Sequence, residues 1–392
     1  MPDTILALNA GSSSIKFGLF EVREGSVIGL MSKGGIEDIC GDPHFTATGE
    51  DGCKLEDKRW LGKDAQYDAM LGALLTWAEG HVKPDTLVAV GHRVVHGGRD
   101  FIAPVRLTAE IVQQLDALTP LAPLHQPHSL APIRTLMALR PGMPQVACFD
   151  TAFHRTMPAV ATRFALPREY EAEGVRRYGF HGLSYEYIAC ALRQHAPGLA
   201  AGRVVVAHLG SGASLCAMRD GRSQNTTMGF TALDGLVMGT RCGTLDAGVV
   251  LYMLQQKGHP PHEVEHVLYE RSGLLGVSGL SGDMKTLLAS ADKRAREAVE
   301  LFAFRVGQET AAMAASLGGL DGFIFTGGIG EHAAEARAMV CERLQWLGVA
   351  MDAAANTAGA GRISTPDSRV EVHVIPTDEE ATIARHTRDI IA

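Results

Sequence analysis

The first polar residues that could do chemistry lie in TILALNAGSSSIKFGLF, residues 4–20. An apolar run ends at Asn9, Gly11 and three serines follow, and apolar alternation resumes around Lys16. A turn between two strands exposes backbone N–H groups, and Gly11 lets a ligand approach the main chain closely. The serine hydroxyls and Lys16 add donors and positive charge that suit phosphate oxygens. A plain polar hairpin with a surface lysine explains the same residues.

A similar stretch, VVVAHLGSGASLCAMR, begins at Val204, about half a chain length later. In both stretches an apolar strand ends in a polar residue, Asn9 or His208, and a glycine follows two positions on, Gly11 or Gly210. Small residues and a second strand come next. Recurrence of the whole pattern predicts a duplicated fold with two similar halves, whose two turns face one polyphosphate.

A third glycine-rich stretch, TGGIGEHAAEAR, runs from Thr326 to Arg337 after an apolar strand and opens a helix. Backbone N–H groups at a helix start attract anions, and glycines there allow a base or ribose to lie against the main chain. The stretch is neither a Walker A motif nor a GxGxxG motif. Strand–glycine–helix turns are also common packing devices.

Two arginines could bind an anion: Arg93 in GHRVVHGGRDF, just after a predicted strand, and Arg241 in MGTRCGT, surrounded by small residues. An arginine between glycines has little to pack against, so we expect each to point at an anion. The planar guanidinium suits carboxylate or phosphoryl oxygens. A structural salt bridge is the alternative for each arginine.

Three further residues could take part in the same chemistry. Asp150 follows an apolar strand, and the carboxyl ends of strands in open α/β sheets face the ligand crevice. His181 stands between Phe180 and Gly182, where a structural role competes with a catalytic one. Glu379 begins a predicted helix, so helix capping competes with metal binding there.

The elements that must position these residues alternate between strands and helices, which predicts an α/β fold. The predicted strands include 87–90, 146–149, 204–209 and 322–326, and the predicted helices 66–80, 109–118, 294–316 and 333–347. Thr108 is a predicted helix cap before Ala109. The Gly- and Ala-rich stretch 352–361 is predicted to be a surface loop.

Composition limits the class of protein. The chain has 392 residues, 46% of them apolar, which is enough for two domains. With 36 basic and 44 acidic residues the net charge is −8, which argues against nucleic acid or an anionic membrane as the main partner. No apolar stretch reaches the ~18 residues of a membrane helix, and the N-terminus lacks the features of a signal peptide. Seven scattered cysteines without a CxxC pair predict reduced thiols and a cytoplasmic protein.

Taken together, these stretches resemble the acetate kinase family of acyl-phosphate-forming kinases. The matching segments run in family order from near residue 5 to near residue 384: LALNAGSSSIKF, GHRVVHGG, PLAPLH, CFDTAFHRTMP, RRYGFHG, HLGSGAS, MGFTALDGLVMGTR, TGGIGE and IPTDEEATIA. The resemblance implies an actin/hexokinase-like (ASKHA), ribonuclease H-like fold. It implies an N-terminal actin-like ATPase domain, 1–150 completed by 376–392, a C-terminal one, 151–375, and a homodimer.

The resemblance also implies roles, residue by residue. The chemical positions are the magnesium site (Asn9, Glu379), a nucleotide-phosphate contact (Lys16), the substrate-carboxylate contact (Arg93), the catalytic acidic residue (Asp150) and the transition-state stabilisers (His181, Arg241). The nucleotide-binding segments are His208, Leu209, Gly210, Ser211 and Gly212; Asp283, Met284 and Lys285; and Gly328, Ile329, Gly330, Glu331 and His332. The apolar pocket around the substrate's alkyl group is Val95, Leu124 and Phe180.

The implied reaction is attack of acetate on the γ-phosphorus of ATP, which gives acetyl phosphate and ADP, with Mg²⁺ as cofactor and Mn²⁺ as an alternative. Catalysis of this kind is mostly positioning and electrostatic stabilisation. Acetate is already ionised at pH 7, because carboxyl groups have pKa values of about 4, so no general base is needed. We therefore expect Asp150 to orient the metal, its waters or an arginine.

The chain departs from the family pattern at several positions. These are Ser211 and His332 in place of Asn, Leu183 and Tyr185 in place of Thr and His, Asp378 in place of Asn, Thr244 and Ala247 in place of Asp and Pro, and Ala232 in place of a pocket proline. The smaller Ala232 side chain would widen the alkyl site. Because one methylene changes binding by only ~1 kcal/mol in such pockets, propionate is a second substrate candidate beside acetate.

Other functions fit parts of the pattern. Butyrate kinase is a related alternative. A sugar kinase of the same fold would need an Asp general base beside a neutral hydroxyl and no arginine pair on its substrate. An actin-like structural or chaperone module would keep the phosphate loops but not His181, Arg93 and Arg241. The arginines favour a carboxylate kinase.

Overall fold

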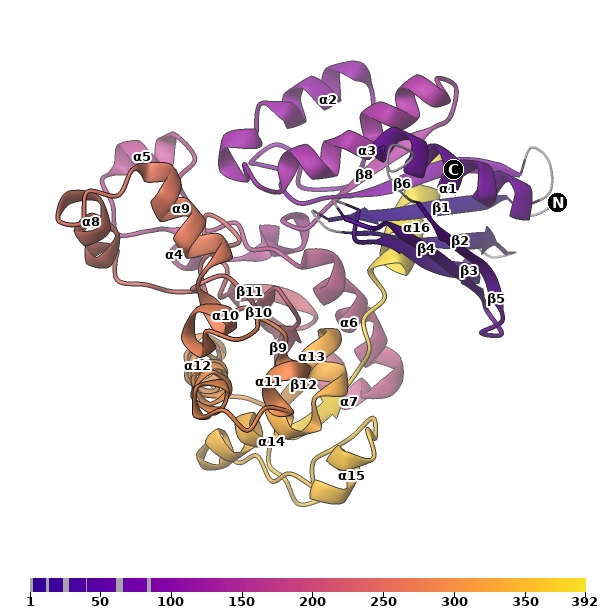
Figure 1. Ribbon diagram of the computed structural model, residues 1–392. Coiled ribbons are helices and arrows are strands. Elements are labelled where there is room, and N and C mark those ends of the chain that lie inside the picture. Colours follow the sequence, from indigo (N-terminus) through magenta and orange to yellow (C-terminus); the bar gives the residue numbers. More distant parts are fainter. Residues whose placement is uncertain (1–2, 12–13, 24–27, 40, 61–65, 83–85) are drawn as a thin grey trace. The chain divides into compact units, whose positions relative to one another are not determined.

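The computed structural model describes residues 3–11, 14–23, 28–39, 41–60, 66–82 and 86–392 (Figure 1). Ser12 and Ser13, two of the three predicted hydroxyl donors, and Cys40 lie outside the described residues. The chain forms two compact units, one of Met1–Phe153 with Asp378–Ala392 and the other of His154–Thr377. The final helix of the chain therefore belongs to the first unit.

The first unit contains a mixed sheet in the order β5-β4-β3-β2-β1-β6-β8-β7. Within the series β5-β4-β3-β2-β1 each pair is antiparallel, β6 and β8 run parallel to β1, and β7 is antiparallel to β8. The strands are β1 (Thr4–Ala10), β2 (Ser14–Val22), β3 (Ile28–Glu37), β4 (His44–Gly49), β5 (Lys54–Arg59), β6 (Leu87–Val94), β7 (Val105–Arg106) and β8 (Gln145–Phe149).

Helices cover both faces of this sheet. They are α1 (Tyr67–His81), α2 (Ala109–Asp116), α3 (Gln126–Leu139), the short 3₁₀ turn η3 (Thr119–Leu121) and α16 (Glu379–Ile391). On one face Phe17 packs edge-on against Trp77 of α1, with ring centroids 5.3 Å apart. On the other face α16 packs against β1, β6 and β8 (Figure 1). A Cβ atom on Gly91 of β6 would lie 2.5 Å from the Ile383 side chain, so this glycine permits the close packing of α16.

The second unit contains a five-stranded sheet in the order β11-β10-β9-β12-β13. Its strands are β9 (Arg203–Leu209), β10 (Ala213–Arg219), β11 (Arg222–Thr226), β12 (Gly322–Thr326) and β13 (Glu371–Val374). Each pair runs in the same relative direction as its counterpart in the series β3-β2-β1-β6-β8. The predicted duplication of the fold is therefore confirmed at the level of strand order and direction.

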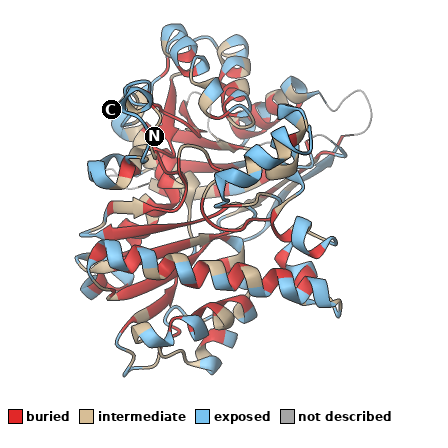
Figure 2. Ribbon diagram, turned by 90° about the vertical axis from the view of Figure 1, so that its left-hand side faces the viewer, coloured by how far each residue is buried: buried red, intermediate tan, exposed pale blue. Residues whose placement is uncertain are grey.

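The remaining helices and 3₁₀ turns lie in the second unit, except that η4 begins at the end of the first unit. They are α4 (Ala159–Thr162), α5 (Arg168–Ala172), α6 (Gly182–His195), α7 (Pro197–Ala200), α8 (Ala247–Gln255), α9 (Pro261–Glu270), α10 (Gly273–Ser278), α11 (Met284–Leu288), α12 (Lys293–Leu317), α13 (Gly327–His332), α14 (Ala334–Arg343) and α15 (Ala353–Thr357), with the 3₁₀ turns η4 (Ala152–Thr156) and η5 (Gln345–Leu347). Long α12 packs a buried stripe against β9, β10 and β11 and ends at Gly318 in the left-handed conformation. Figure 2 shows buried strands and helices that are buried on one side only.

The structure confirms the predicted strands and the Thr108 cap, whose hydroxyl accepts a hydrogen bond from the Ile111 N–H at 3.2 Å. The predicted loop 352–361 is wrong in part, because Asp352 caps the short helix α15 through the N–H groups of Ala354 and Ala355. Predicted helix 333–347 divides into α14 and η5. Within the described residues, the helices are all too short or too polar to cross a lipid bilayer.

Candidate functional site

In the first unit, three parallel strands bring their carboxyl ends together. β1 ends beside Asn9, β6 carries Arg93, and Asp150 directly follows β8. The register pairs Leu8 with His92 and Arg93 with Cys148, so the three side chains lie at one edge of the sheet. These residues are far apart in sequence and are assembled by the parallel pairing of β1, β6 and β8.

Arg93 is the centre of this first cluster. Its Nη2 and Nε donate to Asp150 Oδ2 at 2.6 and 3.0 Å, and its Nη1 donates to Asn9 Oδ1 at 3.2 Å. Asp150 is fully buried. Burial by itself would lower the pKa of Arg93, but Asp150, Glu379 and Glu380 raise it above its usual value, so the guanidinium remains charged. The salt bridge considered for Arg93 from the sequence exists, and its partner is the predicted catalytic aspartate.

The start of α16 adds two carboxylates to the cluster. The Asn9 side-chain amide donates to Glu379 at 2.9 Å and to Glu380 at 3.1 Å. Glu379 is not the helix cap, because Asp378 takes that role by accepting from the Ala381 N–H at 2.7 Å. Burial, followed by the neighbouring Glu379 and Asp378, raises the pKa of Glu380. Asn9 and Glu379 thus present oxygen ligands of the type that Mg²⁺ prefers.

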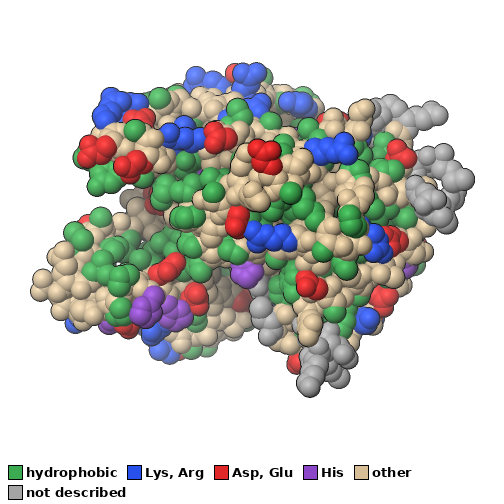
Figure 3. Space-filling view, turned by 90° about the horizontal axis from the view of Figure 1, so that it is seen from above, with side chains coloured by type: hydrophobic (Ala, Val, Ile, Leu, Met, Phe, Trp, Pro, Cys, Tyr) green, Lys and Arg blue, Asp and Glu red, His purple; other side chains and the backbone are tan. Residues whose placement is uncertain are grey.

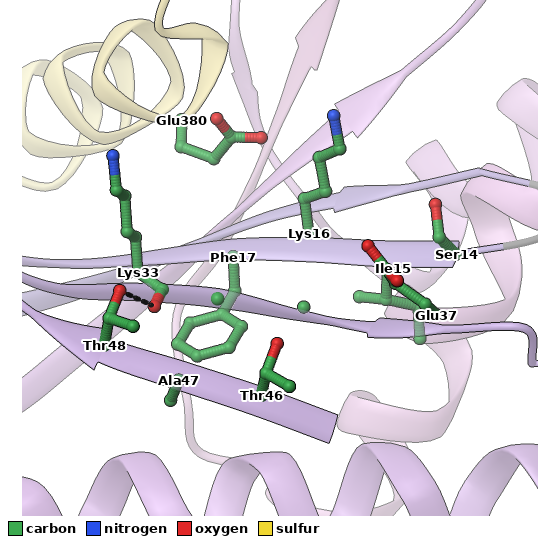
Figure 4. A pocket seen from close by; sticks show the side chains of 12 residues that line it. Ser14, Ile15, Lys16, Phe17, Lys33, Glu37, Thr46, Ala47, Thr48 and Glu380 are labelled. Carbon is green, nitrogen blue, oxygen red and sulfur yellow. Dashed lines mark hydrogen bonds between the residues drawn. The ribbon is translucent and has the colours of Figure 1, made fainter. Parts of the chain in front are cut away.

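Lys16 lies opposite Asn9 in the β1–β2 hairpin and is exposed. It lines a pocket of about 310 Å³ on the open face of β2, β3 and β4, together with Ser14, Lys33, Thr46, Thr48 and Glu380. Figure 4 shows the two lysine side chains extending to the same side of the strands as the Glu380 carboxylate. The predicted phosphate-binding lysine is therefore solvent-accessible beside the Asn9 cluster.

The predicted apolar pocket residues fall into both units. Val95 is buried just after β6, where its N–H donates to the Ser129 hydroxyl at 3.4 Å. Leu124 is partly exposed in the turn before α3. Phe180 is buried in the second unit, and its carbonyl accepts from the ring of His154 at 2.9 Å.

In the second unit, the β9–β10 hairpin is the centre of a second cluster. Its turn closes through the Gly210 N–H donating to the Gly212 carbonyl at 3.0 Å. His208, near the end of β9, stacks its ring on that of His181, with centroids 4.3 Å apart. His181 caps α6 with φ of 58°, a left-handed conformation that is costly for a residue other than glycine and is frequent at functional sites.

Arg241 approaches the same turn. Its Nη1 donates to the Ala232 carbonyl at 2.6 Å. A Cβ atom on Gly212 would lie 2.7 Å from Arg241 Nη2 and 3.3 Å from His181 Nε2. The two predicted transition-state stabilisers therefore converge on Gly212.

Side-chain hydroxyls support the two histidines. His181 Nδ1 lies 2.8 Å from Ser214 Oγ, and His208 Nδ1 lies 2.8 Å from Ser184 Oγ. The Tyr185 hydroxyl lies 2.5 Å from the same Ser214 oxygen. Sequence reasoning missed Ser214 and Ser184 and noted Tyr185 only as a departure. The signals that could have found them are the i, i+4 spacing from His181 to Tyr185 and the strand position opposite His208.

The remaining predicted nucleotide segments lie at helix starts of the second unit. Glu331 accepts from the Gly327 N–H at 2.9 Å and from the Thr377 N–H at 3.2 Å, so its side chain stabilises the loop that opens α13. Asp283 caps α11 by accepting from the Thr286 N–H at 2.8 Å. A Cβ atom on Gly328 would meet nothing within 4 Å, so the main chain there is open to a ligand.

A model of the acetokinase family matches residues 4–385. The chain belongs to the acetokinase family. An acetate kinase of Rhodopseudomonas palustris is 56% identical over 390 residues, which cover 98% of each chain. An acetate kinase of Methylocella silvestris is 52% identical over 99% of this chain and 98% of its own.

Solved structures agree with this membership. A Porphyromonas gingivalis acetate kinase is 34% identical, with a TM-score of 0.86 over 100% of both chains. A Francisella tularensis propionate kinase is 36% identical, with a TM-score of 0.90 over 99% of this chain and 100% of its own. The predicted actin/hexokinase-like α/β fold of the acetokinase family is thereby confirmed.

Proposed function

We propose that this protein is an acetate kinase, which transfers the γ-phosphoryl group of ATP reversibly to acetate and forms acetyl phosphate and ADP. The observation that carries the proposal is the pair of Arg93 with the fully buried Asp150, in which Arg93 also donates to Asn9, in a chain 56% identical to an acetate kinase over almost its full length. A sugar kinase would need a general-base aspartate next to its acceptor hydroxyl. Here the candidate aspartate, Asp150, is paired with the guanidinium of Arg93.

The contacts of Arg93 suit a carboxylate substrate. A guanidinium has five N–H donors, and within the described part of the chain three of them serve Asp150 and Asn9. One N–H on each terminal nitrogen lies outside these contacts, and a carboxylate could accept hydrogen bonds from both. Asp150 holds the guanidinium in place, and it needs to remove no proton because the substrate is already ionised.

In the reaction, a carboxylate oxygen of acetate forms a bond to the γ-phosphorus while the bond to the β,γ-bridging oxygen breaks. Negative charge spreads over the three equatorial oxygens of the transferring group. Arg241 and the Nε2 side of His181 converge on the Gly212 turn, and both can donate hydrogen bonds to those oxygens. We assign these two residues to transition-state stabilisation.

The oxygen atoms of Asn9 and Glu379 would hold Mg²⁺, with Mn²⁺ as an alternative ion. The cation would neutralise part of the charge on the β- and γ-phosphates. Asn9 is already oriented by Arg93, Glu379 and Glu380. We assign Lys16, residues 208–212, 283–285 and 328–332 to nucleotide binding, and Val95, Leu124 and Phe180 to the alkyl group of the substrate.

The test is a panel of acetate, propionate and butyrate with Mg-ATP, scored by trapping the acyl phosphate as its hydroxamate. We expect acetate to give the highest kcat/KM. Propionate is the second candidate, because the small Ala232 side chain, in place of a pocket proline, would widen the alkyl site and because the related Francisella tularensis protein is a propionate kinase. Release of ADP without hydroxamate for all three acids would contradict a carboxylate kinase.

We further propose that the chain forms a homodimer and is cytoplasmic, and that segments 1–150 with 376–392 and 151–375 act as two actin-like ATPase domains. The cytoplasmic assignment is supported by the six described cysteines, which form no disulfide bond with one another.

The candidate dimer surface is α8, whose sequence AGVVLYMLQ is strongly apolar although none of its nine residues, all described, is buried. Leu251 and Tyr252 are about half exposed, at 51% and 50%. Figure 3 shows apolar side chains among charged ones across this face of the molecule, including the left-hand side, on which α8 lies in Figure 1. Leu251→Glu should convert a dimer into a monomer in sedimentation velocity. A parent that sediments as a monomer would contradict the proposal.

A further inference from the structure

Three side chains of the second unit form a hydrogen-bonded series that ends at His181. Tyr185 on the first turn of α6 is fully buried, and its hydroxyl lies 2.5 Å from Ser214 Oγ. Ser214, on β10, is also fully buried, and its oxygen lies 2.8 Å from His181 Nδ1. One hydroxyl therefore joins a phenol to the imidazole proposed to contact the transferring group.

The direction of these bonds follows from acidity. Burial raises the pKa of Tyr185 well above its usual value, so the phenol keeps its proton. A phenol is a much stronger acid than an aliphatic hydroxyl, so the short bond is best made with Tyr185 donating to Ser214. The Ser214 proton then points to His181 Nδ1, which accepts it. A neutral imidazole that accepts at Nδ1 carries its own proton on Nε2.

We propose that Tyr185 and Ser214 are positioning residues that hold His181 as the Nε2–H tautomer, so that it donates a hydrogen bond to the transferring phosphoryl group. The proposal rests on the proposed function for the identity of that group. His181 Nε2 is the ring nitrogen on the Gly212 side, and Arg241 Nη2 also approaches Gly212, so the proton is placed on the side where the second proposed donor lies. Without the series, His181 could carry its proton on Nδ1 and present a lone pair to a negatively charged group.

Tyr185 differs from the residue that the family pattern has at this position, which is histidine. A second imidazole could change its own protonation state near neutral pH, whereas a buried phenol stays a donor. In this chain the tautomer of His181 is therefore tied to a group that does not titrate in the working range. The proposal therefore gives a reason for tyrosine at position 185, which the sequence alone did not explain.

The test compares Tyr185→Phe and Ser214→Ala with the parent. We expect kcat to fall roughly tenfold in Tyr185→Phe and further in Ser214→Ala, with KM for acetate and ATP within twofold, because misplacing a catalytic donor affects the transition state more than binding. The matched control is Tyr178→Phe, which removes another buried phenol, bonded to the Gly174 carbonyl at 2.9 Å, and should leave kcat unchanged.

The second readout does not depend on activity. In ¹⁵N-histidine-labelled protein, the two-bond nitrogen–proton correlations of His181, assigned with His181→Gln, should show the pure Nε2–H tautomer in the parent and a mixture in Ser214→Ala. A parent with no carboxylate kinase activity but a pure Nε2–H tautomer would contradict the proposed function and still support the positioning role of Tyr185 and Ser214. A Ser214→Ala variant that is folded and has the parental tautomer and kcat would contradict the positioning role of Tyr185 and Ser214.

Discussion

The two hairpins of the molecule share a backbone pattern and carry different chemistry. In the first, Asn9 is the strand partner of Lys16, and in the second, His208 is the partner of Ser214. The second turn is one residue shorter, because Leu209 pairs with Ala213 whereas Ala10 pairs with Ile15. Equivalent places on the duplicated fold therefore hold an amide opposite a lysine in one unit and an imidazole opposite a hydroxyl in the other.

The side chains around the two hairpins also differ in charge. Near Asn9, full charges are balanced against each other, with Arg93 between Asp150 and Glu379. Near His208, neutral hydroxyls orient two stacked imidazoles. We infer that duplication supplied two similar anion-facing turns, and that later substitution made one suited to a carboxylate and a cation and the other to a transferring phosphoryl group. Fold likeness alone would not have predicted this division.

The largest expected effect comes from removing one arginine in each unit. We expect Arg93→Ala combined with Arg241→Ala to lower kcat/KM for acetyl phosphate formation roughly 10⁴-fold, since one electrostatic donor is typically worth ~10²–10³-fold. Initial rates of hydroxamate formation measure it. Arg134→Ala and Arg163→Ala, which break exposed ion pairs with Asp116 and Glu171, are the controls for each unit and should stay near the parental rate. A double variant at the parental rate would rule out the proposed mechanism.

Asp150→Asn tests the charged cluster alone. The amide keeps the shape of the side chain but removes the charge that fixes Arg93, so we expect kcat/KM for acetate to fall about 100-fold, or ~3 kcal/mol in transition-state stabilisation. The Kd for Mg-ATP, measured by calorimetry, should change much less. Normal Mg-ATP binding together with full activity would contradict the orienting role of Asp150.

The sequence predicts the hairpins and strand ends well because these signals are local. Apolar runs that stop at Asn9, Asp150 and His208 place a polar group at a strand end, and glycines next to them mark the turns. Helix 353–357 was missed because Ala- and Gly-rich sequence gives no clear period, and its cap, Asp352, is the only strong local signal.

The partners of the site residues could not be predicted from local signals. Arg93 and Asp150 are 57 residues apart, and Asn9 and Glu380 are 371 apart. Such contacts depend on strand order and on the return of α16 to the first unit. From the sequence, Arg93 could face either a substrate or a salt-bridge partner. The structure shows the salt bridge to Asp150 and a further hydrogen bond to Asn9, and the substrate contact stays a proposal.

Buried histidines extend the comparison to acid stability. His92 and His96 in the first unit and His154 in the second are buried, and burial lowers the pKa of each to about 4. The unfolded chain, with a pKa of about 6.5 for each, binds more protons between these values, so stability falls as the pH drops from about 6.5 towards 4.

For each histidine, the free energy of unfolding should fall by about 2 kcal/mol between pH 7 and pH 5. Urea unfolding at the two pH values measures it. His92→Leu should make the fall in unfolding free energy smaller by the contribution of His92. If the difference in unfolding free energy between pH 7 and pH 5 is the same in this variant as in the parent, the folded protein protonates His92 as readily as the unfolded chain does.

The most direct comparison of the hairpins uses one methyl group in each turn. A Cβ atom on Gly11 would lie 3.5 Å from the Ser14 carbonyl, an ordinary contact, whereas one on Gly212 would lie 2.7 Å from Arg241 Nη2. Gly212→Ala should therefore lower kcat about tenfold, because Arg241 Nη2 must shift and His181 Nε2 would be in tight contact at 3.3 Å, and Gly11→Ala should lower kcat less. Steady-state kinetics at saturating acetate and ATP measures the difference. Equal effects would contradict the proposal that the Gly212 turn positions Arg241 and His181 for catalysis.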